Sequence, residues 1–526
     1  MIGSMLRKAQ LSGGCAATDP PGQVGGLTAT GGVGTISLSW NADSTAAPNQ
    51  ATYYQIERSP EQFPGIWTFV TETTSTSFVD TRAASTTWYY RVSACNCDSC
   101  GLVSATAGAT TQSSTPTASW TLDFSSGTPS GYTLTRASSG TYVDSSGYVA
   151  SASTDVARLT HNSSGTRLGL LVEESRTNQA LRSEDFGNAY WTKNKCSITA
   201  NNATSPDNTT TADLIVEDSA TGFRGLNMGG VTVAGGVVCG SCFCKKPSTN
   251  GRDVVGIGFE SSSGYFGRRF DLTNGTSVGT TYNTNTTNVT NIDYGVEDYG
   301  NGWYRCWVSA SLANNTGVNL RINPMPSSTT PFLFGLADYT GDGVSGILVW
   351  GAQQEAGAKP TAYIPTTTAT VTRSADLAHV LDSAITSWGD PGALVVHFYP
   401  PGKAGTLLST DDASTAQVGI EASSTTAARA FWSSGSTSTG TIGTGVQKAV
   451  HYWNGSVSKF VLNGGSVQSG TNNLTIANTD FVTLGAEATD SSGVPGTFSQ
   501  YANCVIRKVE FYSGTLTDAN LQTITT

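Results

Sequence analysis

Charge is scarce in this sequence, and the little that is present has a negative excess. Only 13% of the 526 residues are charged, and 28 Lys and Arg against 38 Asp and Glu leave a formal net charge of −10. Nucleic-acid affinity depends largely on Lys and Arg side chains that displace counterions from phosphates. We therefore expect no nucleic-acid partner.

Long apolar runs and helical periodicity are also rare. The longest apolar runs span about eight residues, whereas a membrane-spanning helix needs about 20. We therefore expect no insertion into a membrane. Only residues 374–383 and 517–524 keep a helical period with suitable ends, so these are the two helices that we predict.

Histidine is also scarce, with four in the chain. They are scattered among different parts of the sequence: His161, His379, His397 and His451. A catalytic triad or a histidine metal centre requires several such side chains in contact. We predict neither.

What the sequence does contain is typical of many short strands joined by tight turns. Its 60 glycines, with abundant Ser and Thr, separate short apolar runs. The length exceeds what one hydrophobic core usually serves, so about three or four domains are expected. We predict an all-β fold of several β-sandwich modules in series, with very little helix.

The first 22 residues have no strand signal. Met1 to Lys8 carries basic residues but no apolar core follows, so the segment is not a signal peptide and we expect synthesis in a cytoplasm. The segment ends at Asp19-Pro20-Pro21-Gly22, which interrupts regular structure. We interpret residues 1–22 as an anchoring or a flexible segment.

Residues 23–112 contain about seven short strand signals, which fits an immunoglobulin-like sandwich. Residues 35–40, 54–58 and 90–94 alternate apolar and polar side chains. Their order, from Pro20-Pro21-Gly22 through Trp40 to the segment that ends at Ala94, resembles a fibronectin type III domain. The resemblance implies a spacer.

Residues 113–180 read as a linker and a β-rich region. From residue 168 to residue 376 the sequence contains eight separate strings in a fixed order: residues 168–178, 182–186, 189–191, 212–214, 301–305, 346–355, 363–366 and 371–376. Together they resemble a recurring segment of phage tail and head fibre proteins, which is similar to a carbohydrate-binding-module jelly roll. We assign this module to residues 181–372.

Residues 373–526 again indicate short strands. Residues 393–399 form a buried run, Asn463-Gly464 marks a hairpin turn, and residues 504–513 form a last strand before the predicted C-terminal helix. This order resembles a concanavalin A or laminin-G-type jelly roll.

Ten cysteines include two clusters, Cys95-Cys97-Cys100 and Cys239-Cys242-Cys244. Each has one C-x-x-C step that could supply two zinc ligands, but no matching second half lies nearby. Buried thiols or disulfides formed after release are the preferred interpretation. Cys15 with the first cluster, and Cys196 or Cys306 with the second, remain open pairings.

Carboxylates suggest two further sites. Asp338 and Asp342 flank a glycine and could hold Ca²⁺, although a tight turn is preferred and we predict no metal. The pairs Glu173-Glu174, Glu184-Asp185 and Asp411-Asp412 could serve a glycosidase. Adjacent residues of a strand point to opposite faces, so neighbouring carboxylates are not expected to act as a catalytic pair. We predict no catalytic residues and no cofactor.

Aromatic side chains are the stronger candidates for ligand contacts, because sugars stack on Trp and Tyr rings. The candidate sugar-binding patch consists of Arg429, Trp432, Tyr452, Trp453 and Asn454. At least one of these rings is expected to be in the core instead.

The resemblances imply a bacteriophage virion fibre protein, on tail or head, that contacts host cell-surface polysaccharide and is not an enzyme. They also imply a homotrimer attached to other virion proteins through the N-terminal segment. The alternatives are a virion decoration protein without a host ligand, and a glycan depolymerase.

Overall fold

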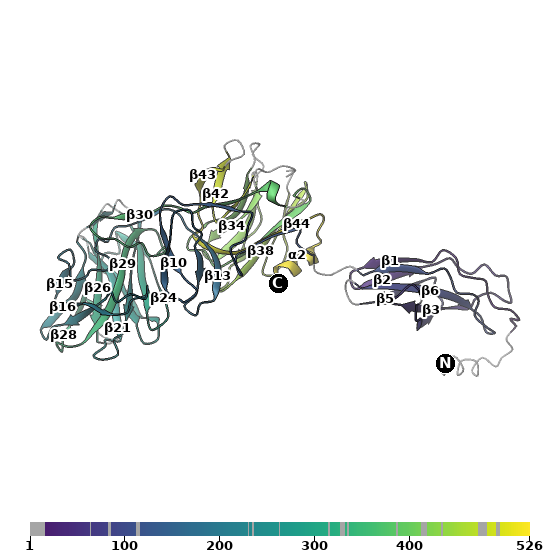
Figure 1. Cartoon of the computed structure of the whole chain (residues 1–526), viewed down its shortest axis with the longest axis horizontal. Coiled ribbons are helices and arrows are strands. Elements are labelled where there is room, and N and C mark those ends of the chain that lie inside the picture. Colours follow the sequence, from purple (N-terminus) through teal and green to yellow (C-terminus); the bar gives the residue numbers. More distant parts are fainter. Residues whose placement is uncertain are drawn as a thin grey trace. The chain divides into compact units, whose positions relative to one another are not determined.

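The structure, a computed structural model, describes most of the chain. The described residues are 16–63, 65–82, 86–111, 116–229, 231–233, 236–261, 264–313, 316–326, 332–333, 336–385, 388–411, 418–432, 435–471, 481–490 and 495–526. They divide into two compact units, Met1–Pro116 and Thr117–Thr526. Each unit is described by itself, and Figure 1 labels its elements.

The N-terminal unit is a small sandwich of two antiparallel sheets, with strand orders β1-β2-β5 and β4-β3-β6-β7. Its strands are β1 (Thr28–Gly32), β2 (Thr35–Ser39), β3 (Tyr53–Ser59), β4 (Thr68–Thr73), β5 (Ser77–Thr81), β6 (Thr87–Cys95) and β7 (Ala107–Thr110). Alternation along β2 and β3 buries Leu38 and Ile56 in one core with Val92. The strands predicted at residues 35–40, 54–58 and 90–94 are confirmed.

The second unit contains a central sandwich whose first sheet has nine strands. Its path is β23-β22-β21-β26-β18-β28-β27, with β15 paired to β18 and β19 paired to β26. The strands are β15 (Thr192–Asn194), β18 (Thr221–Asn227), β19 (Val231–Val233), β21 (Val254–Ser261), β22 (Gly264–Asp271), β23 (Thr276–Asn283), β26 (Thr316–Met325), β27 (Phe332–Leu333) and β28 (Leu336–Thr340).

The facing sheet of the central sandwich runs β16-β17-β29-β20-β25-β24. Its strands are β16 (Cys196–Ala203), β17 (Ala212–Glu217), β20 (Gly236–Lys245), β24 (Val289–Asp298), β25 (Tyr304–Leu312) and β29 (Gly346–Ala356). Ile257 and Ile322 from the first sheet pack with Val308 and Val349 from the second in one core. Burial of such apolar side chains is the main driving force for closing the sandwich.

A C-terminal sandwich follows, and one of its sheets includes strands from far upstream. This sheet runs β12-β13-β44-β32-β38-β39-β40, with β8 also paired to β44. The strands are β8 (Trp120–Asp123), β12 (Leu159–His161), β13 (Arg167–Val172), β32 (Gly392–Phe398), β38 (Gln447–Trp453), β39 (Val457–Leu462), β40 (Gln468–Thr471) and β44 (Cys504–Ser513).

Its partner sheet runs β36-β35-β34-β33-β41-β31-β9, with β37 paired to β35. The strands are β9 (Thr133–Thr135), β31 (Leu377–Leu381), β33 (Gly405–Asp411), β34 (Val418–Ser424), β35 (Ala427–Trp432), β36 (Gly435–Ser436), β37 (Gly440–Thr441) and β41 (Phe481–Leu484). Leu394 and Ile506 pack against Leu408 and Ile420 between the two sheets.

The described part of the second unit also contains three short two-stranded sheets and two short helices. The strand pairs are β10 (Gly140–Val143) with β11 (Val149–Ala152), β14 (Arg176–Asn178) with β30 (Val371–Arg373), and β42 (Glu487–Asp490) with β43 (Pro495–Ser499). The helices are the 3-10 turn η1 (Asp382–Ala384) and α2 (Asp518–Thr525).

The all-β fold of several sandwich modules with very little helix is therefore confirmed. The region of residues 113–180, interpreted as a linker and a β-rich region, supplies β8, β9, β12 and β13 to the two sheets of the C-terminal sandwich. These four strands share a core with residues 373–526, whereas Val149 of β11 packs with Phe243 and Trp350 of the central sandwich.

One of the two predicted helices is confirmed and the other is wrong. Helix α2 begins with a capping box between Thr517 and Asn520, as its sequence suggests. Within residues 374–383, Leu377–Leu381 instead form strand β31, which pairs with β41 on one side and β9 on the other, and residues 382–383 begin η1. Ladder hydrogen bonds to two neighbours outweigh the weak helical pattern of this segment.

The cysteines differ between the two units. Cys95 is bonded to Cys100, and Cys97 is also in a disulfide, whereas the suggested partner Cys15 lies outside the described residues. Cys196, Cys239, Cys242, Cys244, Cys306 and Cys504 of the second unit are free thiols, and all but Cys196 are buried. Burial raises the pKa of the Cys239, Cys242 and Cys244 thiols well above the usual value. Neutral buried thiols are poor metal ligands and poor nucleophiles.

We therefore expect iodoacetamide at about pH 8 to label Cys239, Cys242 and Cys244 of the native protein at least about a hundredfold more slowly than a free thiol. Labelling read by peptide mass spectrometry checks this, with guanidinium-unfolded protein as the control in which all three react. Fast labelling of native Cys242 would contradict the burial of this cluster.

His451 of β38 makes stability depend on pH. Its Nδ1 lies 3.0 Å from the Gly419 carbonyl oxygen and its Nε2 lies 3.1 Å from Ser458 Oγ. A carbonyl can only accept, so Nδ1 carries the proton of the neutral ring. Burial lowers the pKa of His451 to about 4, so the unfolded chain binds a proton that the folded chain does not.

Stability should consequently be complete above the unfolded pKa of about 6.5 and fall by about 3 kcal/mol as the pH drops to about 4. Urea unfolding at several pH values measures this slope, and His451→Asn, which retains a donor for Gly419, should flatten it. His379→Asn is the matched control, because His379 is only half-buried and should remove less of the slope. An unchanged slope in His451→Asn would refute the assignment.

Candidate functional site

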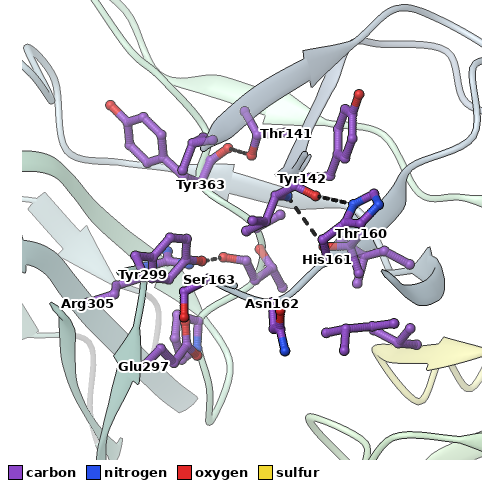
Figure 2. Close-up of a pocket in the computed structure, with 18 of the residues that line it drawn as sticks. Thr141, Tyr142, Thr160, His161, Asn162, Ser163, Glu297, Tyr299, Arg305 and Tyr363 are labelled. Atoms are coloured by element: carbon purple, nitrogen blue, oxygen red, sulfur yellow. Dashed lines mark hydrogen bonds between the residues drawn. The ribbon is translucent and has the colours of Figure 1, made fainter. Parts of the chain in front are cut away.

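A pocket of about 390 Å³ lies within the second unit, where the hairpin β10-β11 and strands β12 and β13 meet the central sandwich. Strand β24, strand β25 and residues 360–363 form the opposite wall. Figure 2 shows Glu297, Tyr299 and Arg305 on one side of it and Thr160 and His161 on the other. The walls thus come from segments that are far apart in the sequence.

Aromatic and hydroxyl side chains dominate the lining. Tyr142, Tyr299 and Tyr363 contribute rings, and Thr160 and Ser163 contribute hydroxyl groups. The hydroxyl of Thr141 donates to the Tyr363 carbonyl oxygen and so joins β10 to the opposite wall. A surface of rings edged by hydrogen-bonding groups is suited to a polyhydroxylated ligand.

Two glutamates of the pocket have opposite properties. Burial raises the pKa of half-buried Glu297, and the nearby carboxylates of Glu173 and Glu355 add to this although Arg305 opposes it. Burial would also raise the pKa of Glu173, but Arg373 and Arg158 outweigh it and lower that pKa to about 2. Glu173 is therefore ionised at every physiological pH, whereas Glu297 takes up a proton more readily than an exposed glutamate.

Glu173 is fully engaged by the protein. Its Oε2 accepts from Arg158 Nη1 at 2.7 Å and lies 3.4 Å from Arg373 Nη2, and its Oε1 accepts from the Ala362 amide at 2.8 Å. Both oxygens have partners, so this carboxylate orients the pocket wall and is not free to attack a substrate.

Behind Glu173 lies a buried charge network made of Arg136, Arg158, Arg373, Glu173 and Asp376. Arg136 Nη1 lies 2.9 Å from Asp376 Oδ1, and Arg158 Nη2 contacts Asp376 Oδ2. All five side chains are almost completely shielded from solvent. Charges buried this way are stable only when paired and hydrogen-bonded.

Guanidinium N–H groups of the network also donate hydrogen bonds to backbone carbonyl oxygens. Arg136 Nη2 donates to the Ser153 carbonyl at 2.7 Å, Arg158 Nη1 to that of Thr141 at 3.0 Å, and Arg373 Nη2 to that of Glu174 at 2.7 Å. Gly140 passes directly over the network, where an added Cβ would lie 3.1 Å from Arg158 Cδ. The network therefore fixes β10, which forms one wall of the pocket.

The predicted sugar-binding patch is placed elsewhere, and its rings are buried. Trp432 and Trp453 belong to the core between the sheets of the C-terminal sandwich, and Tyr452 packs under α2 on the outer face of β38. Arg429 Nε pairs with Glu421 Oε1 at 2.6 Å, and Asn454 closes the β38-β39 turn through the Val457 amide. The core interpretation therefore holds for all three rings, and they offer no stacking surface to a sugar.

The suggested calcium loop is closed by internal contacts. Asp342 Oδ1 accepts from the Val344 amide at 2.9 Å and the Ser345 amide at 2.7 Å, and Arg252 lies 3.1 Å from Oδ2. Burial opposes ionisation of Asp342, but these hydrogen bonds outweigh it and lower its pKa strongly. The carboxylate already has a cation, Arg252, beside it. The side chain of Asp338 lies outside the described ones.

The paired carboxylates also have structural partners. Glu174 contacts Arg176 and accepts from Lys403 Nζ at 2.9 Å, while Glu184 accepts from the Tyr363 hydroxyl at 2.9 Å. Asp185 lies 3.6 Å from Arg182. The side chain of Asp411 and the whole of Asp412 lie outside the described part. Within that part, no group of three His, Cys, Asp or Glu side chains is arranged to hold a metal ion.

Sequence reasoning did not identify this pocket, because its residues come from β10, β12, β24 and β25. One signal was available: Glu173, Arg305, Tyr363, Arg373 and Asp376 all lie within the strings singled out between residues 168 and 376. A charged residue inside an otherwise apolar strand, as at Arg305, indicates a buried partner.

Comparisons with known proteins add a limited likeness. No protein-family model matches the chain. No curated protein is similar to it. In the described residues, no helix is long and apolar enough to cross a membrane.

Fibronectin type III-like domains are matched structurally over less than a fifth of the chain. A fibronectin type III-like protein from Clostridium thermocellum is 33% identical over 17% of this chain and 92% of that one, with a TM-score of 0.15. The sixth such domain of human fibronectin type III domain containing protein 3 is 18% identical over 19% and 93%, with a TM-score of 0.17. The structure of titin kinase and its flanking domains is 18% identical over 18% of each chain, with a TM-score of 0.16.

Because the buried charge network joins distant segments, removing one carboxylate should destabilise the second unit. We expect Asp376→Asn to lower the free energy of unfolding by about 3–5 kcal/mol, since three guanidinium groups then share one carboxylate. Urea unfolding measures this. Asp298→Asn, which removes an exposed carboxylate of the pocket, is the matched control and should change stability by less than about 0.5 kcal/mol. A loss below about 1 kcal/mol in Asp376→Asn would contradict the role of the network.

Proposed function

We propose that the chain is a structural adhesin of a bacteriophage virion fibre, on tail or head, which contacts host cell-surface polysaccharide and catalyses no reaction. We further propose that the glycan contact is the pocket beside β10, in place of the patch at Arg429, Trp432, Tyr452, Trp453 and Asn454.

One observation carries the proposal. Four of the strings that resemble phage fibre proteins converge on this pocket and its buried charge network. Leu168 and Glu173 come from the string at residues 168–178, Arg305 from 301–305, Tyr363 from 363–366, and Arg373 from 371–376. Features that recur in such proteins are thus gathered where a small ligand has room to bind.

The chemistry of the pocket favours binding over cleavage. Glycosidases of the usual kind need two carboxyl groups, one as an acid and one as a base or nucleophile. Glu297 has the raised pKa of an acid, but Glu173, which lies near enough to influence it, is held by Arg158 and Arg373. An engaged carboxylate cannot activate water or attack a sugar, so the pocket is better suited to holding a glycan.

The remaining parts fit a fibre. The N-terminal unit acts in this proposal as a spacer, and residues 1–22, of which only 16–22 are described, attach to other virion proteins. Edge strands of the sandwiches are available for association, and we propose a homotrimer on the resemblance to phage fibres. The protein is made in the host cytoplasm and incorporated into the virion.

The test is binding of the labelled full-length protein to a panel of bacteria, with and without stripped surface polysaccharide. We expect saturable binding that stripping abolishes. Tyr142→Ala should weaken this binding at least about tenfold, because the variant removes a ring of the pocket. Tyr89→Ala, which removes a half-buried tyrosine of the N-terminal unit, is the matched control and should bind normally.

The alternatives give different results in the same experiment. A virion decoration protein without a host ligand binds no cell in the panel, and this outcome would overturn the adhesin proposal. A depolymerase releases reducing sugar ends from isolated polysaccharide, whereas we expect no release. Normal binding by Tyr142→Ala would leave an adhesin whose contact lies outside this pocket.

A further inference from the structure

The charges that line the pocket do not cancel. Its lining contains the carboxylates of Glu173, Glu297 and Asp298 and one guanidinium, that of Arg305. Arg158 and Arg373 neutralise Glu173 from behind. Among the ion pairs of the described residues, none includes Glu297 or Asp298. These two carboxyl groups therefore have no basic partner within ion-pair distance in the described part of the chain.

Arg305 is already committed to the protein. Its Nε and Nη2 donate to Ser241 Oγ at 3.2 and 3.1 Å, and its Nη1 donates to the Thr361 carbonyl at 2.7 Å. Arg305 is opposite Glu297 in the pairing of β25 with β24, yet no ion pair forms between them. The guanidinium is fully buried, so it cannot turn toward an acidic ligand without breaking these bonds.

Three other polar groups of the lining add two acceptors and one donor. His161 Nδ1 lies 3.0 Å from the Val143 carbonyl oxygen and must donate to it, which leaves Nε2 of the neutral ring as an acceptor. Asp298 Oδ1 accepts from the Gly300 amide at 2.7 Å. Asn162 offers a donor, because three neighbouring groups already use its Oδ1.

We infer that the pocket selects a glycan bearing a protonated amine and rejects acidic sugars, with Glu297 as the residue that pairs with the ammonium group. This inference rests on the proposed function, since it names the chemical class of the glycan. An ammonium group can donate to the Glu297 carboxylate, and the ring of Tyr142 or Tyr299 can add a cation–π contact. A uronic acid or sialic acid would place another carboxylate beside Glu297 and Asp298, and the donors of Arg305 are already used by the protein.

The experiment compares three soluble oligosaccharides of similar length by isothermal titration with the full-length protein. They are fully deacetylated chitosan oligomers, their fully N-acetylated counterparts, and oligogalacturonate. We expect the amine-bearing oligomer to bind about tenfold to a hundredfold more tightly than the acetylated one, the range of one charge-assisted hydrogen bond, and oligogalacturonate not to bind.

Glu297→Gln keeps the shape of the side chain and removes its charge, so it should bring the amine-bearing and acetylated oligomers to equal affinity. Glu487→Gln changes the net charge equally, at a half-buried glutamate of β42 that is not part of the pocket, and should preserve the preference. Circular dichroism and urea unfolding verify that both variants are folded.

Other outcomes overturn the inference. Equal binding of the amine-bearing and acetylated oligomers would refute it and leave the adhesin proposal standing, as would tighter binding of oligogalacturonate. Binding of none of the three would also refute it, and the cell-binding experiment then decides separately whether the protein is an adhesin. A preference that persists in Glu297→Gln would assign the selection to another residue.

Discussion

The buried charge network of Arg136, Arg158, Arg373, Glu173 and Asp376 is the interaction on which the second unit depends most. Removing five charges from water costs several kcal/mol for each ion, and only their mutual contacts and the backbone carbonyls around them offset this cost. The partners are distant in sequence, with 240 residues between Arg136 and Asp376. The network can therefore form only when the β10 hairpin, β13 and the segment after β30 are all in place, which makes it a specific requirement for this arrangement of strands.

The pocket follows from the network. Gly140 lies against three of its arginines and leads into Thr141 and Tyr142, while Glu173 holds the Ala362 amide on the opposite wall. A site assembled on strands that are fixed from behind by buried ion pairs is pre-organised, so a ligand loses little of its binding energy to ordering the protein. The same contacts occupy Glu173, whereas half-buried Glu297 takes part in no ion pair of the described residues. The pocket is therefore better suited to recognition of a glycan than to its hydrolysis.

Period-two alternation and turn chemistry predicted the all-β class and many strands, such as β2, β32 and β44, because these depend on local sequence. The predictions failed where distant segments decide. Residues 377–381, within the helix predicted at residues 374–383, form a strand because they pair with β9 and β41. Trp432, Tyr452 and Trp453 were predicted to contact a sugar with at least one of the rings in the core, and all three are buried. Helix α2 covers one face of β38 and the partner sheet covers the other, so the neighbours Tyr452 and Trp453, which point in opposite directions, are both buried. Sequence also could not reveal that Tyr142, Glu297 and Arg305 would share a pocket.

The central claim is that this pocket is where the protein holds a glycan. The most direct measurement is a crystal structure of the full-length protein with an oligosaccharide released from the polysaccharide of a bacterium that it binds. The account predicts electron density for sugar rings in the pocket, in contact with Tyr142 and within hydrogen-bond distance of the Glu297 carboxylate. Sugar density only at another surface, with the pocket unchanged, would contradict it.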